Sequence, residues 1–244
     1  MEKNAIITGT NRGLGKEFVK QFAENGYNVW ACAREKSEKF EEYLKELSEK
    51  NSVWVKPVYF DLAKEEEIKD KLGGLLKEKH SVDVLINNAG TAYGGLFTMT
   101  PVKVMREVYE VNVFSQVAVM QMVARKMMRQ KSGNIINLCS VGGIETEPGY
   151  LAYGSSKAAL IWITKCLSKE LGQYNIRVNG IAPGLVHTDM GHYKPENEIE
   201  KTIARTSLGR MGDAKEIGSA ALYMASEEAG FMTGHILVMD GGRV

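Results

Sequence analysis

Short apolar runs rich in β-branched residues alternate along the chain with longer segments in which apolar positions recur every three or four residues. The first pattern is typical of buried strands and the second of amphipathic helices, so their alternation predicts βαβ units and a parallel sheet. Strands are expected at residues 4–9, 27–34, 52–62, 82–90, 133–140, 176–184 and 234–242. Helices are expected at 13–26, 37–50, 64–80, 101–130, 153–174 and 213–228, whereas 184–207 is polar and predicted to be irregular.

These elements predict one α/β domain over residues 1–244, with a doubly wound (Rossmann) parallel sheet of about seven strands and helices on both faces. The length suffices for one large core, and no repeat or linker divides the chain. In such sheets ligands bind beyond the carboxyl ends of the strands. The residues that follow each strand are therefore the candidates for function.

Composition narrows the class of protein. Lys and Arg total 31 against 30 for Asp and Glu, a net charge of +1, so we expect no nucleic-acid partner. The three cysteines, Cys32, Cys139 and Cys166, fit neither a disulfide framework nor a zinc pattern and are expected to be reduced thiols. No apolar run reaches about 18 residues and no export signal is recognisable. We therefore expect a cytoplasmic protein without a membrane partner.

A glycine-rich stretch, Thr8 to Gly15, stands between the first predicted strand and the first predicted helix. Its glycines at 9, 13 and 15 allow a tight turn and a close approach of the backbone to a ligand. The N-terminus of the following helix offers free N–H groups and the positive end of its dipole to a pyrophosphate. A glycine-rich loop in this position predicts a dinucleotide site.

The end of the second predicted strand bears on which dinucleotide is bound. NAD sites place an acidic residue there for the ribose 2′-hydroxyl, whereas this strand ends in Cys32, Ala33 and Arg34. Arg34, with Arg12 from the glycine loop, offers guanidinium groups that suit a 2′-phosphate, which favours NADP(H). The alternative is that both arginines are solvated surface charges, since Glu35 can pair with Arg34.

Tyr153 and Lys157 stand four residues apart at the start of a predicted helix, which places both side chains on one face. A free tyrosine, with a pKa of about 10, is a poor proton shuttle at neutral pH. A nearby ammonium group and the positive charge of an oxidised nicotinamide would lower that pKa, so that Tyr153 could protonate a carbonyl oxygen. This spacing is common by chance, and Ser140 and Asn112 give it more weight.

A series of motifs along the whole chain resembles the short-chain dehydrogenase/reductase family. They are TGTNRGLG (Thr8 to Gly15), DL (Asp61 and Leu62), NNAG (Asn87 to Gly90), VNVFS with Asn112, Ser140 thirteen residues before Tyr153, YGSSK, and APGLVHTDM from Ala182. The resemblance implies an NADP(H)-dependent enzyme that reduces a ketone to a secondary alcohol, with Asn112, Ser140, Tyr153 and Lys157 as catalytic residues. The implied cofactor-binding residues are Gly9, Asn11, Arg12, Gly13, Leu14, Gly15, Arg34, Asp61, Leu62, Asn88, Ala89, Gly90, Tyr153, Lys157, Pro183, Gly184, Val186 and Thr188.

The resemblance also implies a role for each catalytic residue. Tyr153 would donate the proton, Ser140 would polarise the carbonyl, and Lys157 would lower the tyrosine pKa while binding the ribose hydroxyls. Asn112 would hold a water that links Lys157 to solvent. Family members resemble one another in forming homo-oligomers, so a homotetramer or a dimer is expected, built on the helix at 101–130, the catalytic helix and the last strand.

The pattern is most similar to the branch of bacterial 3-oxoacyl-[acyl carrier protein] reductases, but the substrate signals divide. Lys131, with Arg125, Lys126 and Arg129, supplies a basic cluster for an acidic carrier, whereas the second basic contact of that branch falls on Tyr174. Glu145 and Glu147 lie in the loop before Tyr153, where they would repel an acidic carrier if they face inward. They can also simply point to water.

Two alternatives therefore stay open. One is a reductase of a small polar ketone, such as a keto-sugar or polyol, with hydroxyls bound by Glu145, Glu147 and His187. The other is a non-catalytic NADP(H) sensor. Residues 189–206 are expected to form a substrate lid. No metal is expected, because His187 and His192 have a spacing that suits no common zinc pattern.

Overall fold

The computed structural model describes residues 2–189, 191 and 196–243. Its sheet has seven strands in the order β3-β2-β1-β4-β5-β6-β7, and each neighbouring pair is parallel. The strand order changes direction between β1 and β4, which places the topological switch point where these two strands end. The strands are β1 (Lys3–Thr8), β2 (Tyr27–Ala33), β3 (Val55–Tyr59), β4 (Val84–Asn87), β5 (Gly133–Leu138), β6 (Ile176–Pro183) and β7 (Ile236–Met239). The predicted doubly wound sheet in a single α/β domain is confirmed.

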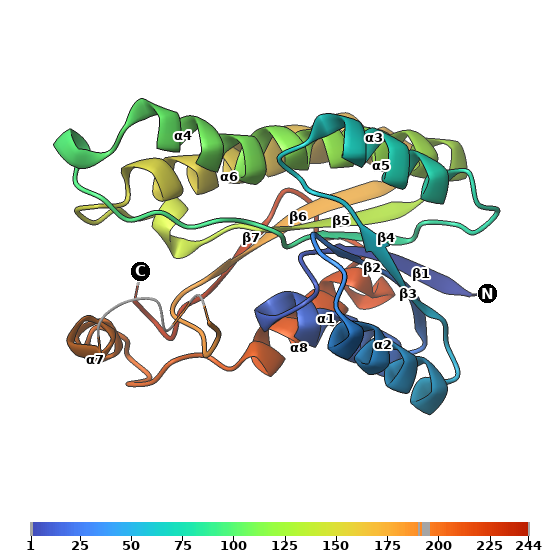
Figure 1. The fold of residues 1–244 in the computed structure, drawn as a ribbon, viewed down its shortest axis with the longest axis horizontal. Helices are drawn as coiled ribbons and strands as arrows, with labels where there is room; N and C mark the ends of the chain where they lie inside the picture. Colours follow the sequence, from blue (N-terminus) through green and yellow to red (C-terminus); the bar gives the residue numbers. More distant parts are fainter. Residues whose placement is uncertain (1, 190, 192–195, 244) are drawn as a thin grey trace.

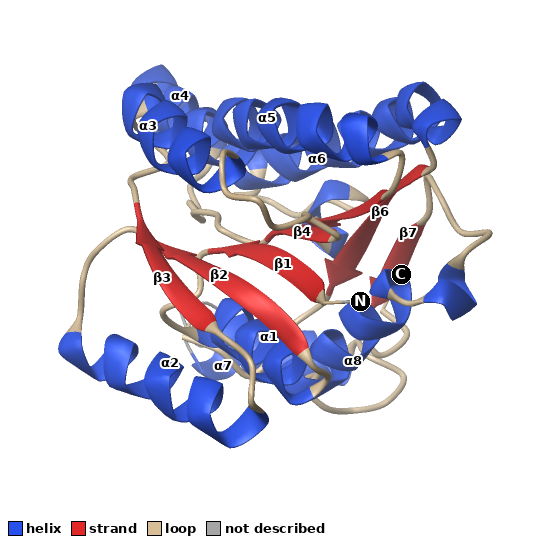
Figure 2. Ribbon diagram, turned by 90° about the vertical axis from the view of Figure 1, so that its right-hand side faces the viewer, coloured by secondary structure: helices blue, strands red, loops and turns tan. Residues whose placement is uncertain are grey.

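Helices cover both faces of the sheet (Figures 1 and 2). One layer contains α3 (Glu65–Leu76), α4 (Val102–Tyr109), α5 (Ser115–Gln130) and α6 (Leu151–Leu171), and the other contains α1 (Gly13–Glu24), α2 (Glu38–Asn51) and α8 (Ala214–Ala225). A further helix, α7 (Glu196–Ala204), lies beyond the strand ends near the C-terminus. Among the described residues, no helix has the length and apolar character needed to cross a membrane.

Apolar side chains alternate between two cores because successive residues of a strand point to opposite faces. In β1, Ala5 and Ile7 join Phe18 and Phe22 on the α1 side, whereas Ile6 packs on the other side with the buried parts of α3 and α5. Every residue of β2 and of β4 is buried. Continuous apolar runs are typical of parallel strands covered on both faces, so the sheet is a rigid support for the loops at its edge.

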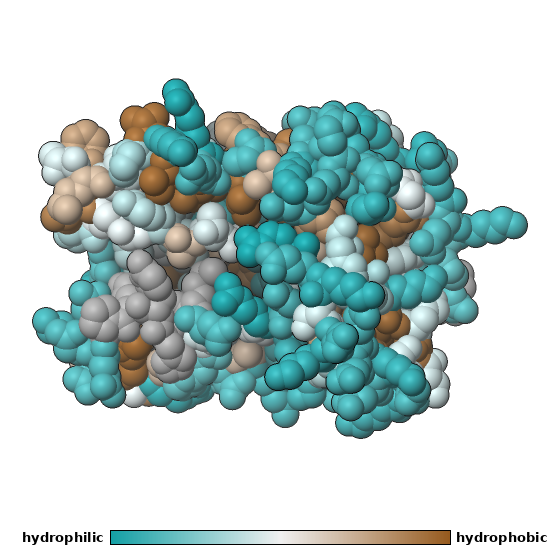
Figure 3. Space-filling view, viewed as in Figure 1, coloured by the Kyte–Doolittle hydropathy of each residue, from teal (hydrophilic) through white to brown (hydrophobic). Residues whose placement is uncertain are grey.

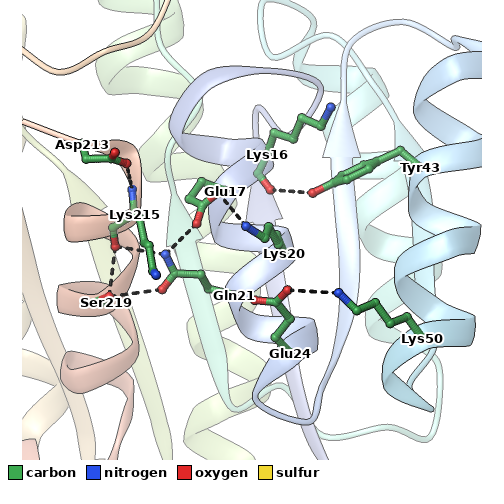
Figure 4. A network of polar contacts seen from close by, with 10 residues as sticks. All are labelled: Lys16, Glu17, Lys20, Gln21, Glu24, Tyr43, Lys50, Asp213, Lys215 and Ser219. Atoms are coloured by element: carbon green, nitrogen blue, oxygen red, sulfur yellow. Dashed lines mark hydrogen bonds and ion pairs between the residues drawn. The ribbon is translucent and has the colours of Figure 1, made fainter.

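Helix α1, which carries the glycine loop, is held between α2 and α8 (Figure 4). Gln21 Nε2 donates to Glu17 Oε1 at 2.8 Å and to the Lys215 carbonyl of α8 at 3.0 Å. A Cβ at Gly218 would lie 2.3 Å from that Gln21 nitrogen, so the two helices are in close contact at this point. The position of the loop relative to the sheet is therefore fixed from both sides.

The structure differs from the sequence prediction at several places in the chain. Residues 184–207 were predicted to be irregular, but they include α7, whose nine residues are mostly polar and bury only Thr202, so their apolar periodicity is weak. The helix predicted at 101–130 is interrupted by a π-helical turn, Glu110–Phe114. The helix predicted to start at Tyr153 starts at Leu151, and Ser155 donates to the Leu151 carbonyl one turn before it.

Strand β3 is shorter than predicted, Val55–Tyr59 instead of 52–62. Ser52 ends α2 in a left-handed conformation, with φ 54°, and Val53 N donates to the Ser48 carbonyl, so these residues belong to the helix end. At the other end, Asp61 and Leu62 form a turn into α3.

Candidate active site

The glycine loop leaves β1 at the switch point and enters α1. Gly9 adopts a φ of 69°, which is in the left-handed region that favours glycine. A Cβ at Gly15 would lie 2.0 Å from the Gly9 carbonyl oxygen, so the helix start passes directly over the turn. The side chain at the N-cap position of α1, Arg12, makes no capping hydrogen bond, so it leaves the first N–H groups of the helix available to a ligand. This cradle fits the pyrophosphate of a dinucleotide.

Thr8 and Thr10 hold the glycine loop in place, a role that the sequence did not indicate. Thr8 Oγ1 accepts the N–H groups of Asn88 and Ala89, each at 3.0 Å, and Thr10 donates both its N–H and its hydroxyl to the Cys32 carbonyl, at 3.1 and 3.0 Å. The Asn88 amide in turn donates to the carbonyls of Thr8 and Gly9 at 2.8 and 3.0 Å. Asn88, predicted to bind cofactor, thus uses its side-chain N–H groups inside the protein.

The two predicted phosphate-binding arginines lie at the surface near the ends of β1 and β2. Arg34 Nε lies 3.2 Å from Glu35 Oε1, the pair that the alternative interpretation anticipated, and Arg12 Nη1 lies 3.7 Å from Asp189 Oδ2. All four side chains are about 70% exposed. Exposed pairs of this kind contribute at most about 1 kcal/mol, so both guanidinium groups can exchange their partner for a phosphate.

The remaining predicted cofactor residues follow β3, β4 and β6. Asp61 Oδ1 accepts the Ala63 N–H at 2.9 Å in the turn after β3, and the adjoining Leu62 carbonyl accepts from Ser115. Pro183 ends β6, and Gly184 N donates to the Met239 carbonyl at 2.9 Å. The segment after β6 returns over the glycine loop, because a Cβ at Gly13 would lie 3.7 Å from Thr188. The structure thus brings Thr188, two residues after Val186, next to the loop; Asn11 lies within the loop, and Leu14 lies in the first turn of α1.

Ser140, Tyr153 and Lys157 come together where β5 ends. Ser140 Oγ accepts the Gly142 N–H at 3.1 Å and is hydrogen-bonded to the Tyr153 side chain. Lys157 is buried, its Nζ donates to the Leu138 carbonyl at 2.6 Å, and the same atom lies 5.9 Å from the centre of the Tyr153 ring. Two features bring these side chains together: the spacing of four residues between Tyr153 and Lys157 on α6, and the position of Ser140 after the end of β5.

Burial dominates the proton affinities of the pair. It raises the pKa of Tyr153, which the hydrogen bond with Ser140 lowers in part. It also lowers the pKa of Lys157 to about 8, since a buried ammonium group is poorly solvated. The protein's own groups therefore do not produce the lowered tyrosine pKa that was expected. A phenolate at neutral pH would need the further positive charge that an oxidised nicotinamide carries.

Asn112 lies in the π-helical turn and is fully buried. Its amide donates to the Thr91 carbonyl at 2.9 Å and to Ser156 Oγ at 3.0 Å, and its Oδ1 accepts the Thr91 N–H at 2.8 Å. A Cβ at Gly90 would lie 3.2 Å from Asn112 Oδ1 and 3.5 Å from Lys157 Nζ, so the chain after β4 passes between these two groups. Asn112 thereby joins the loop after β4 to α6. Thr91 and Ser156, which complete this arrangement, carried no signal in the sequence beyond their place beside known motifs.

The residues that were expected to bear on the choice of substrate do not lie together in the structure. Glu145 is exposed, whereas Glu147 is partly buried and accepts from Arg205 and Arg243. Lys126, in the predicted basic cluster, donates to the carbonyls of Leu76 and Glu78 at 3.0 and 2.8 Å. That cluster ends α5 beside the start of β5, whereas Ser140 follows its end, so the cluster lies at the far edge of the sheet.

The sequence predicted no metal site at His187 and His192, two histidines that follow β6 along the chain. His187 N donates to the Gly212 carbonyl at 3.0 Å, and His192 lies outside the described residues, as does part of the predicted lid. No group of three or more potential metal ligands occurs within the part of the chain that the structure describes.

Comparison with known proteins places the chain among reductases and dehydrogenases. Residues 9–243 match the family model described as enoyl-(acyl carrier protein) reductase. The chain is 36% identical to the 3-oxoacyl-[acyl-carrier-protein] reductase FabG of Chlamydia muridarum over 244 residues, which covers 99% of this chain and 97% of the relative. It is also 36% identical to the 3α-hydroxysteroid dehydrogenase of Mediterraneibacter gnavus, over 98% of this chain and 96% of the relative.

A solved structure of 7α-hydroxysteroid dehydrogenase, in complex with NADH and 7-oxo glycochenodeoxycholic acid, superposes with a TM-score of 0.91. It is 33% identical, and the match covers 98% of this chain and 93% of that one. The glycine cradle at the switch point fits the nicotinamide dinucleotide that such proteins bind. With the family model and relatives matched along nearly its whole length, the chain belongs to the short-chain dehydrogenase/reductase family of oxidoreductases.

Proposed function

We propose that the protein is an NADP(H)-dependent reductase that converts a ketone to a secondary alcohol, with a 3-oxoacyl thioester of the acyl carrier protein type as its substrate. The observation that carries the proposal is the group formed by Ser140, Tyr153 and Lys157 beside the glycine cradle. The similarity to 3-oxoacyl-[acyl-carrier-protein] reductases supports the choice of substrate.

Each residue then has a defined task. The Tyr153 hydroxyl, the proton donor, gives its proton to the carbonyl oxygen, and Ser140 donates a hydrogen bond to the same oxygen. Lys157, whose pKa of about 8 keeps it mostly protonated at neutral pH, holds positive charge close to Tyr153 and binds the ribose. Asn112 positions the loop after β4 and α6 around Lys157. The nicotinamide, when bound, supplies the hydride.

The test is the consumption of NADPH with an acetoacetyl thioester by wild type and by Tyr153→Phe. Removal of the proton donor is expected to lower kcat by about 10²–10⁴-fold while NADPH still binds. Tyr174→Phe, in the short turn that follows α6, is the matched control and is expected to behave as wild type. Full activity of Tyr153→Phe would overturn the mechanism. Tight NADPH binding by a wild-type protein that turns over no carbonyl would support the sensor instead.

The preference for NADP(H) rests on Arg12 and Arg34, the exposed cations near the end of β2. We expect Arg34→Gln to lower kcat/KM for NADPH about tenfold, because a charged hydrogen bond to the 2′-phosphate contributes about 1.5–3 kcal/mol. The value for NADH should hardly change. Equal losses with both cofactors would show that Arg34 acts on something other than the 2′-phosphate.

A second candidate substrate is a large apolar ketone such as an oxosteroid. Exposed apolar side chains gather before α4, at the upper left of Figure 3, and include Leu96, Phe97 and Met99. This segment reaches the loop before α6, where Gly95 N donates to the Gly149 carbonyl at 3.1 Å and Ile144 is also exposed. An apolar rim here fits a steroid body, and two hydroxysteroid dehydrogenases are among the similar proteins. Turnover of an oxosteroid in preference to an acetoacetyl thioester would favour this candidate.

We also propose that the protein is a homo-oligomer. Phe114, in the π-helical turn that leads into α5, and Trp162, on α6, expose large aromatic rings, and Phe231 is fully exposed before β7. Exposed aromatic side chains that gather into one patch are typical of contact regions between subunits. The size of the protein in solution tests this proposal.

A further inference from the structure

Glu147 is a feature of the loop before α6 that the reaction does not use. Its carboxylate accepts hydrogen bonds from two arginines, Arg205 after α7 and Arg243 after β7. The side chain of Glu147 is 22% exposed and that of Arg243 is 6% exposed, whereas that of Arg205 is 57% exposed. We call these three residues the arginine cluster.

The backbone that carries the two arginines is built as one unit. Leu208 N donates to the Gly241 carbonyl at 3.0 Å, and Ser207 Oγ donates to the Gly242 carbonyl at 3.0 Å. The end of α7 and the C-terminal residues therefore run side by side, as Figure 1 shows beyond the strand ends. This pairing delivers both guanidinium groups to the same carboxylate oxygen of Glu147.

The arginine cluster contains two positive charges and one negative charge. A buried arginine needs an opposite charge, and Glu147 supplies it to Arg243. The same carboxylate cannot neutralise a second guanidinium group, and within the described residues Arg205 has no other acidic partner. The cluster thus has a net charge of +1, and its surplus charge lies on the exposed arginine. The sequence left open whether Glu147 would repel an anion; paired with two arginines, its carboxylate is more than neutralised and would not.

The cluster also lies close to the reacting groups. Tyr150 N donates to the Glu147 carbonyl at 3.1 Å, and the Tyr150 ring stands edge-on to the Tyr153 ring with centroids 6.4 Å apart. The same loop contacts the apolar segment before α4 through Gly149. A substrate whose carbonyl reaches Tyr153 would therefore lie near the loop that carries Glu147, which contacts both the apolar segment and Arg205.

We propose that Arg205 binds an anionic group of the substrate, a phosphate or a carboxylate remote from the reacting carbonyl, and that Glu147 and Arg243 hold it in place. The proposal rests on the proposed reduction of a carbonyl at Tyr153. An anion arriving at Arg205 takes the guanidinium donors that Glu147 leaves free, and Glu147 stays paired with Arg243. The phosphates of an acyl-pantetheine chain and the carboxylate of a conjugated steroid are two sources of the same chemistry.

The test compares substrates that share a reacting group and differ in charge. Acetoacetyl-coenzyme A carries phosphates, whereas the acetoacetyl thioester of N-acetylcysteamine is neutral. We expect Arg205→Gln to lower the ratio of kcat/KM values, charged over neutral, about tenfold, as expected for a charged hydrogen bond. Arg205→Lys should restore part of the ratio, because it keeps the charge. A glycine-conjugated oxosteroid against its uncharged methyl ester distinguishes the carboxylate from the phosphate.

Arg210→Gln is the matched control, since Arg210 is 52% exposed and pairs with one carboxylate, Glu216 of α8. It should leave the ratio unchanged. Calorimetric titration of the NADPH complex with coenzyme A alone tests the anion site without turnover, so the proposal is tested even if neither thioester is reduced. Weaker binding of coenzyme A by Arg205→Gln supports the proposal. A ratio and a binding affinity that Arg205→Gln leaves unchanged, or equal losses in Arg210→Gln, would overturn it.

Discussion

Alanine at Gly15 tests whether the close approach of α1 to the glycine turn is required. The new Cβ would lie 2.0 Å from the Gly9 carbonyl oxygen and 2.6 Å from Asn88 Nδ2. An ordinary contact begins at about 3.4 Å, so the carbonyl would have to retreat by about 1.4 Å. Neither group can move freely, because Asn88 also holds the carbonyls of Thr8 and Gly9.

The expected cost follows from that geometry. Overpacking of a tight contact costs about 1–3 kcal/mol, and the displaced turn no longer presents its N–H groups to the pyrophosphate. Alanine has a higher helix propensity than glycine by about 1 kcal/mol, which offsets only part of this. We expect Gly15→Ala to be less stable than wild type by about 1–2 kcal/mol and to bind NADPH at least tenfold more weakly.

Gly74→Ala is the matched control, because Gly74 is also helical and a Cβ there would meet nothing within 4 Å. That change should stabilise the protein by about 0.5–1 kcal/mol and leave NADPH binding unchanged. Urea unfolding and the quenching of protein fluorescence by NADPH measure both quantities. If Gly15→Ala matches wild type in stability and affinity, the close approach of α1 to this turn is not required for either.

Three further predictions concern the buried lysine, the arginine cluster and the exposed surface. Lys157→Met should raise the free energy of unfolding by up to about 3 kcal/mol below pH 8, because burial lowers the pKa of Lys157 from 10.5 to about 8. As the pH rises from 8 to 10.5, folded wild type loses the Lys157 proton before the unfolded chain does, so wild type gains stability. The stability advantage of Lys157→Met should therefore shrink over that range, and an advantage independent of pH would contradict this. Glu147→Gln should cost about 2 kcal/mol in urea unfolding, since it leaves Arg243 buried without its carboxylate, and an unchanged midpoint would be inconsistent with that role. Trp162→Glu should reduce the size of the protein measured by light scattering, because it places a charge on an exposed aromatic surface of α6; an unchanged mass would exclude this face from the subunit contact.

The order of strands and helices followed from the sequence because it depends on local patterns. Continuous apolar runs are buried on both faces of a parallel sheet, and this held for β2 and β4. The glycine loop and the Tyr153–Lys157 spacing were equally readable, since each motif needs only its neighbours along the chain and its place after a strand. Boundaries were less accurate where tertiary contacts decide them, as at the π-helical turn that holds Asn112.

The sequence by itself thus determined the sheet, the cradle and the identity of the residues that the family resemblance points to. Only the tertiary structure decided the charge environment. It buried Lys157 and so lowered its pKa. It also brought Arg205 and Arg243 to Glu147 from positions 58 and 96 residues away. Coulombic and desolvation effects depend on distance in space and on burial, and neither is written in the spacing of residues along a chain.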